Sequence, residues 1–398
     1  MANKKNIKIK RSKGRLYKKK KSGARKVFEV ILLVVIAGGL GFLGYSAAGP
    51  LISYLQNGAD GSSSTTPWEP PESSTPQESD TSDSESEPTT TPQPMSEDTG
   101  SYLLPAAALA NRTALSQALG MAKSAGCSVI IVPVKDGDGH LLYKTNMESV
   151  KDTDLVTGTL SAGEIISAVK GGGFASVKAL VPALYDRTTP SYVDDMCYRF
   201  KGDGYVWLDA AANKGGKMWV DPFRDGTKQY YAELVKELAE AGFDEVLMSE
   251  LRFPDFTTYD QSILDGRSFT PTRHTALTAL YNTASSAAGS NKAAVAVNIA
   301  DVLSGYGKSF GGTAEILSDK SFTGTVYLTV ELSAFGTSLD TGDKTSITLP
   351  ADPAQKAKAL VSKAAEYIGT NVTIVPVISP LGLSAEALAK CYSALSAS

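Results

Sequence analysis

WVDP at residues 219–222 and GFDEVLMSELRFP at residues 242–254 frame the stretch that decides the fold. Between them, apolar residues recur at helical spacing with charged residues in between. The apolar residues are Tyr230, Leu234, Val235, Leu238 and Ala241. Gly242 stands where a helix ends, and a short apolar run at 246–248 then leads to polar residues. A helix, a capping glycine and a buried strand with a polar end form an α/β unit, whose strand ends are the usual place for a site.

The same alternation continues outward from this stretch, from Ser101 to the end of the chain. Its spacing predicts parallel strands joined by helices. A dinucleotide fingerprint and a P-loop are both missing from the sequence. Seven strands, or eight if Tyr205–Asp209 joins the sheet, favour an α/β fold of the (β/α)₈ TIM-barrel type with an incomplete eighth strand. The strands are expected at 102–108, 128–134, 177–184, 244–250, 293–299, 325–332 and 372–378, and the segment 204–221 is expected as an excursion with two short strands.

The N-terminal part has a different composition. Residues 1–26 hold 13 Lys+Arg and no acid, so the other 372 residues carry a net charge of −16. Val30 to Ala48 contains no charged residue, and its 19 residues nearly match the length of a membrane-spanning helix. The basic run before it predicts a cytoplasmic N-terminus and an exported C-terminal part. A cleaved signal peptide is the alternative. An orientation signal beside acidic lipid is favoured over nucleic-acid binding for the basic run.

Residues 57–99 carry ten acids, no base and almost no apolar side chain, which predicts a disordered, self-repelling tether. The expected organisation is therefore a single-pass protein of the cell membrane in four parts. These are a cytoplasmic basic segment (1–26), a transmembrane anchor (27–48), a disordered linker (49–99) and an extracellular barrel (100–398).

Cysteine and histidine are scarce. Three cysteines spread over the chain do not suggest a disulfide framework. Two histidines are too few for a histidine-rich zinc site and leave little for a Ser-His-Asp triad. Neither a cofactor nor a bound metal ion is expected.

Polar residues at the expected strand ends are the candidates for chemistry, because these ends meet on one face of a barrel. They combine acids, arginine and tryptophan, a set that suits a sugar site in which two carboxylates act across a glycosidic bond. The predicted catalytic acids are Glu250, Glu331 and Asp301. The predicted substrate-binding residues are Arg252, Trp207, Trp219, Asp209 and Lys135, with Arg252 orienting a carboxylate and Trp207 or Trp219 stacking on a sugar.

Each candidate also has a structural interpretation. Glu331 ends the run Tyr327-Leu-Thr329-Val-Glu331 on the polar face of its strand, and it is either lumen-facing or a solvated strand end. Glu250 and Arg252 are two residues apart and could form an ion pair that only closes the strand. The sequence Asp136-Gly-Asp138-Gly139 suits a turn better than a calcium loop.

Four motifs resemble a family of glycoside-hydrolase-like barrels, distantly similar to the α-amylase type, in bacterial surface proteins. They are Val134-Lys135-Asp136 with Tyr143, Trp219-Val-Asp221-Pro222, Gly242-Phe-Asp-Glu245 with Arg252-Phe-Pro254, and Ala300-Asp301-Val302. The resemblance covers most of 101–380. It implies a barrel, a carbohydrate substrate and a 244–254 strand that is the fourth, which makes 204–221 an insertion.

Two positions depart from the family pattern. Pro133 and Ser249 stand where the family has Asp, and Ser249 is followed by Glu250. A shift of one residue along a strand turns a side chain to the opposite face, so Glu250 is not a simple replacement. The sequence thus supports a hydrolase acting on a polysaccharide or cell-wall glycan. An inactive glycan-binding barrel and a structural surface module remain as alternatives.

Overall fold

The computed structural model describes residues 100–202, 204–264, 273–289, 292–305, 310–318 and 322–396. The segments 1–26, 27–48 and 49–99 lie outside the described residues, and so do the predictions of an anchor and a linker that fall on them. Among the helices that are described, none has both the length and the apolar character needed to cross a bilayer.

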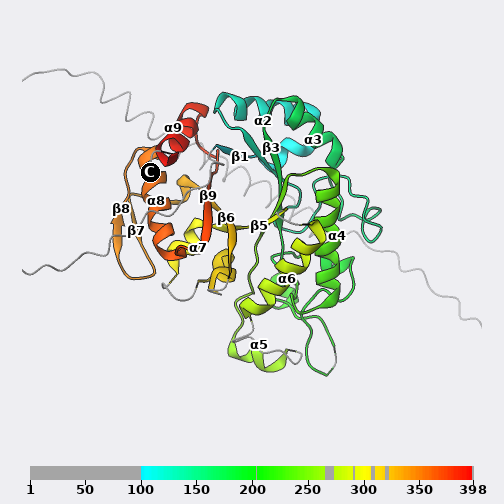
Figure 1. Ribbon diagram of the computed structural model, residues 1–398. Coiled ribbons are helices and arrows are strands. Elements are labelled where there is room, and N and C mark those ends of the chain that lie inside the picture. The colour runs from blue at the N-terminus through cyan, green and yellow to red at the C-terminus, as the bar shows by residue number, and fades with distance from the viewer. Residues whose placement is uncertain are drawn as a thin grey trace, which may run out of the picture. The chain divides into compact units, whose positions relative to one another are not determined.

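Seven parallel strands form a nearly closed α/β barrel of the TIM type (Figure 1). Each strand pairs in parallel with the next one in the sheet. The strand order is β1 (Ser101–Leu103), β2 (Val129–Pro133), β3 (Ser176–Pro182), β4 (Glu245–Ser249), β5 (Ala293–Asn298), β6 (Gly324–Val330) and β9 (Val372–Ile378).

Helices cover the outside of this barrel (Figure 1). The longer ones are α2 (Arg112–Ser124), α3 (Ala162–Gly171), α4 (Asp225–Ala241), α6 (Arg273–Ala288), α8 (Pro353–Ile368) and α9 (Ala385–Ser396). Shorter elements are α5 (Thr258–Ile263), α7 (Ile299–Ser304), the 3₁₀ helices η1 (Ala106–Ala110), η2 (Thr189–Ser191), η3 (Ala212–Lys214), η4 (Gly312–Ser318) and η5 (Leu332–Ala334), and an unpredicted hairpin of β7 (Ser338–Asp340) and β8 (Ser346–Thr348).

The stretch that decided the fold forms the expected unit. Helix α4 buries the apolar face predicted for it, including Tyr230, Leu234 and Leu238. Gly242 ends the helix at φ 106°, a left-handed conformation in which a side chain would be strained. Strand β4 follows at once and is the fourth strand of the barrel, as the family resemblance implied.

The barrel lumen is filled by alternate residues of the strands. A small apolar cluster includes Ile131, Leu247, Tyr327 and Val375. Below it, near the strands' N-terminal ends, the ammonium group of Lys178 lies 3.2 Å from a carboxylate oxygen of Glu245. The Tyr327 hydroxyl donates a hydrogen bond to the same carboxylate at 2.5 Å and accepts one from Lys178. A paired, hydrogen-bonded layer therefore fills the lumen at this end.

The predicted eighth strand is not found among the described residues. Tyr205–Asp209 does not join the sheet, and the two short strands expected in 204–221 are replaced by isolated bridges, Arg199 to Val206 and Cys197 to Val220. The gap between β1 and β9 is spanned instead by Tyr392 of α9. Its hydroxyl donates to the carbonyl of Ser101 and accepts from the amide of Ile378 at 3.1 Å. A helix side chain thus satisfies one polar group on each edge strand, where an eighth strand would have paired.

Candidate functional site

A cavity of about 280 Å³ opens at the C-terminal ends of the strands. Its apolar floor includes Leu180, Ala296 and Val377, which continue the packing of the lumen. Its rim is polar and comes from four different strand ends and the residues that follow them. The polar lining residues used below are Ser249, Glu250, Asn298, Thr313, Thr329, Glu331 and Ser379.

Glu250 reaches this cavity by leaving strand geometry. Strand β4 ends at Ser249, and Glu250 has φ 52°, which is the left-handed region. Extended geometry predicted that Ser249 and Glu250 would point to opposite faces. That prediction is wrong, because the left-handed residue turns the chain and both residues line the same cavity. A residue with a side chain rarely adopts this conformation, and such residues cluster at functional sites.

Arg252 holds the Glu250 side chain. Its Nε lies 2.6 Å from Glu250 Oε2, and the two side chains are 29% and 26% exposed. The guanidinium carbon of Arg252 also lies 4.9 Å from the ring centre of Tyr185 and 5.3 Å from that of Trp219. The arginine is therefore packed against two aromatic rings while its charge faces the carboxylate, an arrangement that fixes the direction of Glu250.

Glu331 lines the same cavity from the end of β6. Its Oε1 accepts a hydrogen bond from the hydroxyl of Ser333 at 2.8 Å. Glu331 is exposed and lines the cavity at the mouth, so it lies at the open end of the lumen and is also solvated. The structure thus brings Glu250 and Glu331 to one cavity.

Asp301 lies behind the cavity wall. Its Oδ2 accepts hydrogen bonds from the amide and the hydroxyl of Thr313, at 2.8 Å and 2.5 Å. The Thr313 hydroxyl oxygen accepts from the amide of Asn298 at 2.7 Å, and both Thr313 and Asn298 line the cavity. Asp301 therefore positions a stretch of the wall and is not among the residues that line the cavity.

The two tryptophans are buried. Trp207 is 4% exposed, packs against Tyr198 and Phe256, and donates its indole hydrogen to Asp260 at 2.9 Å. Trp219 is 6% exposed, and its indole nitrogen donates to Asp209 at 3.0 Å. Neither indole presents an open face to a sugar in this structure, and Asp209 is a partner of Trp219.

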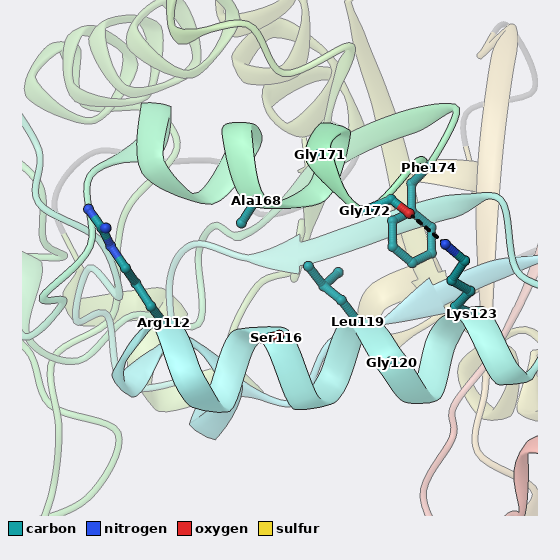
Figure 2. A pocket seen from close by; sticks show the side chains of 9 residues that line it. All are labelled: Arg112, Ser116, Leu119, Gly120, Lys123, Ala168, Gly171, Gly172 and Phe174. Carbon is teal, nitrogen blue, oxygen red and sulfur yellow. Dashed lines mark hydrogen bonds between the residues drawn. The ribbon is translucent and has the colours of Figure 1, made fainter.

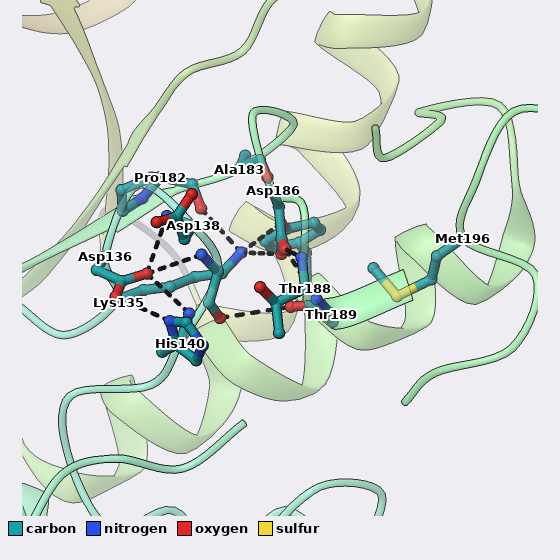
Figure 3. Close-up of polar contacts among 12 residues, drawn as sticks. Lys135, Asp136, Asp138, His140, Pro182, Ala183, Asp186, Thr188, Thr189 and Met196 are labelled. Carbon is teal, nitrogen blue, oxygen red and sulfur yellow. Dashed lines mark hydrogen bonds and ion pairs between the residues drawn. The ribbon is translucent and has the colours of Figure 1, made fainter. Parts of the chain in front are cut away.

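Lys135 is also buried, in a cluster of polar contacts that includes Pro182 and Asp186 (Figure 3). Its ammonium group lies 2.6 Å from Asp186 Oδ2, and both side chains are fully buried. It also donates to the carbonyl of Pro182 at 3.0 Å and to the hydroxyl of Tyr231 at 2.7 Å. Burial lowers the pKa of Lys135, and the carboxylate of Asp186 opposes that shift. Lys135 is thus part of a closed polar cluster with no open side toward a substrate.

Sequence reasoning missed the residues that hold the loop after Arg252. The carboxylate of Glu315 accepts a hydrogen bond from the amide of Phe253 at 3.1 Å and lies 2.5 Å from Arg273 Nε. These residues come from three distant parts of the chain, so no local spacing could have indicated the clamp. Among the described residues, no three histidine, cysteine or acidic side chains converge in a way that could hold a metal ion.

A second hollow of about 390 Å³ lies between α2 and α3 on the outer surface (Figure 2). It is bordered by Arg112, Leu119, Lys123 and Phe174, and Lys123 donates to the carbonyl of Gly172 at 3.3 Å. No lining residue of this hollow carries a carboxylate. The mouth of the barrel, where two carboxylates meet, is therefore the better candidate for hydrolysis.

Comparisons with known proteins agree with the family resemblance. Residues 101–311, more than half of the chain, match the family model described as "Putative glycosyl hydrolase domain". No curated protein matches the chain.

Several solved structures match parts of the chain. A hypothetical protein from Ruminiclostridium thermocellum is 18% identical, with a TM-score of 0.41, over 49% of this chain and 96% of that chain. The PgaB (BpsB) glycoside hydrolase domain from Bordetella bronchiseptica is 17% identical, with a TM-score of 0.39, over 68% and 81%. An α-fucosidase from Thermotoga maritima is 14% identical, with a TM-score of 0.33, over 70% and 54%. On the family-model match, the chain belongs to this glycosyl-hydrolase-like domain family.

Proposed function

We propose that the barrel hydrolyses glycosidic bonds in a polysaccharide or cell-wall glycan at the cavity in its mouth. The observation that carries this proposal is that Glu250 and Glu331, from different strand ends, line one open cavity. Two carboxylates across a scissile bond are what most glycoside hydrolases use.

The contacts suggest different roles for the two acids. Glu250 is ion-paired with Arg252 at 2.6 Å, so we assign it the role that needs a charged carboxylate, namely nucleophile or base. Glu331 accepts one hydroxyl hydrogen bond and is assigned the role of proton donor to the leaving group. Arg252 and Asp301 are positioning residues, since each acts through another residue of the cavity wall.

The test is the release of reducing ends from a panel of polysaccharides and isolated cell walls by the full chain. Glu250→Gln and Glu331→Gln should each reduce the rate by about 100-fold or more, because each removes one member of the acid pair. Glu240→Gln is the matched control and should keep full activity, because Glu240 is exposed near the C-terminal end of α4, just before the N-terminal end of β4 and so on the side of the barrel away from the mouth. Activity that survives in both cavity variants would exclude this site.

A glycan-binding barrel without hydrolysis is the second candidate. Its support is that the Glu250 carboxylate is already engaged by Arg252, and that Ser249 stands where the resembled family has an acid. In that case the wild-type chain retains glycan on an affinity column but releases no reducing ends, and Glu250→Gln leaves retention intact.

We also propose that residues 27–48 anchor the chain in the cell membrane and that 49–99 hold the barrel outside the cell. The support is the uncharged run after a basic segment and the acidic composition of the linker. Protease treatment of intact cells should release the barrel by cutting the linker. A barrel that stays protected in intact cells, or that fractionates without the membrane, would contradict this arrangement.

A further inference from the structure

Two guanidinium groups lie against the ring of Tyr185, which follows β3 by three residues. The guanidinium carbon of Arg187 is 4.6 Å from the ring centre, and that of Arg252 is 4.9 Å from it. Trp219 meets the same ring edge-on at 4.8 Å between centres. Two positive charges that share one ring repel each other, and an anion beside either of them is favourable.

Only one of the two charges is compensated within the described residues. Arg252 is paired with Glu250. No described carboxylate lies within ion-pair distance of the Arg187 guanidinium, and its Nε is buried without a hydrogen-bond partner. A buried guanidinium nitrogen that has lost water and gained no acceptor is unfavourable, so this atom marks a place for an acceptor from outside.

Three acids around this corner already have partners. Asp186 is paired with Lys135 and accepts from the amides of Thr188 and Thr189. Asp136 accepts from three amides of its own turn and from His140 (Figure 3). Asp209 is bonded to the Trp219 indole and to the amide of Lys217. None of these three carboxylates is available to pair with Arg187. Asp138, whose carbonyl accepts from the Arg187 amide at 3.2 Å, has an exposed side chain that forms no ion pair with the guanidinium.

This corner adjoins the proposed active site. Pro182, at the end of β3, lines the cavity, and Tyr185 follows it. Arg252 links Tyr185 directly to Glu250, which also lines the cavity. A group bound at Arg187 would therefore belong to a sugar beside the one on which Glu250 acts.

We propose that Arg187, backed by Tyr185, binds the acidic group of the substrate, and that the substrate is an acidic glycan whose sugars carry a carboxylate or a phosphate. The planar guanidinium matches both groups with paired hydrogen bonds. The inference rests on the proposed function, since it names the substrate class of the same site. It also explains why Arg187, an arginine without an ion-pair partner, lies near Arg252, which is paired with Glu250.

The experiment measures binding of glucose, glucuronate and glucose 6-phosphate to the full chain by ligand-detected NMR at low salt. The three sugars differ only at carbon 6. One or both acidic sugars should bind about tenfold or more tightly than glucose, and added salt should weaken that preference. The stronger acidic ligand distinguishes a carboxylate from a phosphate site.

Arg187→Gln should remove the preference and leave glucose binding unchanged, whereas Arg187→Lys should keep part of it. Arg112→Gln, at an exposed arginine on α2, is the matched control and should behave as wild type. Equal binding of the three sugars, absence of binding, or a preference that survives Arg187→Gln would each overturn the inference.

The outcomes separate this inference from the proposed function. Hydrolysis of neutral glycans that depends on Glu250 but shows no acid preference would leave the function standing and remove the subsite. Binding of acidic sugar that depends on Arg187, without hydrolysis of any glycan, would leave the subsite and remove the catalytic function.

Discussion

Two ion pairs near the C-terminal ends of the strands have the same length and different surroundings. Lys135 and Asp186 lie 2.6 Å apart with fully buried side chains, and Lys135 contacts Tyr231 of α4. Glu250 and Arg252 also lie 2.6 Å apart, but their side chains are 26% and 29% exposed and one of them lines the cavity. The contact distance therefore says nothing about the role of a pair, and the environment decides it.

The buried pair is complete in itself. Tyr231 and Pro182 accept the remaining hydrogen bonds of Lys135, and the amides of Thr188 and Thr189 donate to Asp186. The pair at the mouth is held from one side only, by the rings of Tyr185 and Trp219. We infer that the first pair serves folding and that the second is available for chemistry.

The largest effect should come from breaking the buried pair. Lys135→Met leaves the Asp186 carboxylate buried without its cation, and should lower the free energy of unfolding by about 3–5 kcal/mol. Arg252→Met breaks the pair at the mouth and should cost no more than about 1 kcal/mol, because its partner stays partly solvated. Urea unfolding of both variants measures the difference. Equal losses would show that the two environments are not the cause.

The hydrogen-bonded layer of Lys178, Glu245 and Tyr327 at the N-terminal end of the lumen should contribute less to stability than the buried ion pair. Tyr327→Phe removes the hydroxyl that bridges Lys178 and Glu245, and should destabilise the barrel by about 1–3 kcal/mol. Tyr259→Phe, at a tyrosine that is 71% exposed, is the matched control and should be close to neutral. This layer lies at the opposite end of the lumen from the mouth. Glycan hydrolysis by folded Tyr327→Phe should therefore equal that of wild type. A large loss of rate would show that this hydrogen-bonded layer affects the candidate active site.

The left-handed backbone at Glu250 predicts a smaller effect still. Glu250→Gly and Glu250→Ala both remove the carboxylate, but only glycine is relaxed at φ 52°. Glu250→Gly should therefore be more stable than Glu250→Ala by about 1 kcal/mol, and both should be inactive. Urea unfolding of the two variants measures the free-energy cost of the left-handed backbone at this position, because both variants lack the carboxylate. Equal stability would mean that the wild-type backbone is not strained there.

Much of the barrel could be predicted because its signals are local. The strand at 372–378 has the predicted bounds, and Gly242 ends its helix as expected. The first strand was predicted too long, since Pro105 follows it and a 3₁₀ helix begins at Ala106. The closure by Tyr392 was not predictable, because it joins residues 291 positions apart.

In the candidate site, too, features set by local sequence could be predicted and features set by distant residues could not. Strand parity placed Glu331 at the lumen, which the cavity lining supports. Parity failed at Glu250, because a single left-handed residue changes the direction of the side chain. It also gave no indication that Trp207, Trp219 and Lys135 are buried, since burial depends on packing against residues distant in sequence.

A third ion pair extends the comparison to the surface and predicts the smallest effect. Arg112 and Glu164 lie 2.5 Å apart, with side chains 77% and 36% exposed. The hydrogen bond from Arg112, followed by those from the amide and hydroxyl of Ser161, lowers the pKa of Glu164 from 4.5 to about 2. Because the folded-state pKa is lowered, the stabilisation is present above pH 4.5 and is lost as the pH falls toward 2.

An NMR titration of the Glu164 side-chain carboxyl carbon tests this. The midpoint should lie near 2 in the wild-type chain. In Arg112→Gln it should move up toward 4.5 without reaching it, because the Ser161 hydrogen bonds remain. Added salt should raise the wild-type midpoint, since both groups are solvated. A midpoint that changes with neither the substitution nor the salt would mean that the ion pair does not affect the pKa of Glu164. Solvent exposure would then remove the electrostatic effect of a contact that burial or a cavity wall would preserve.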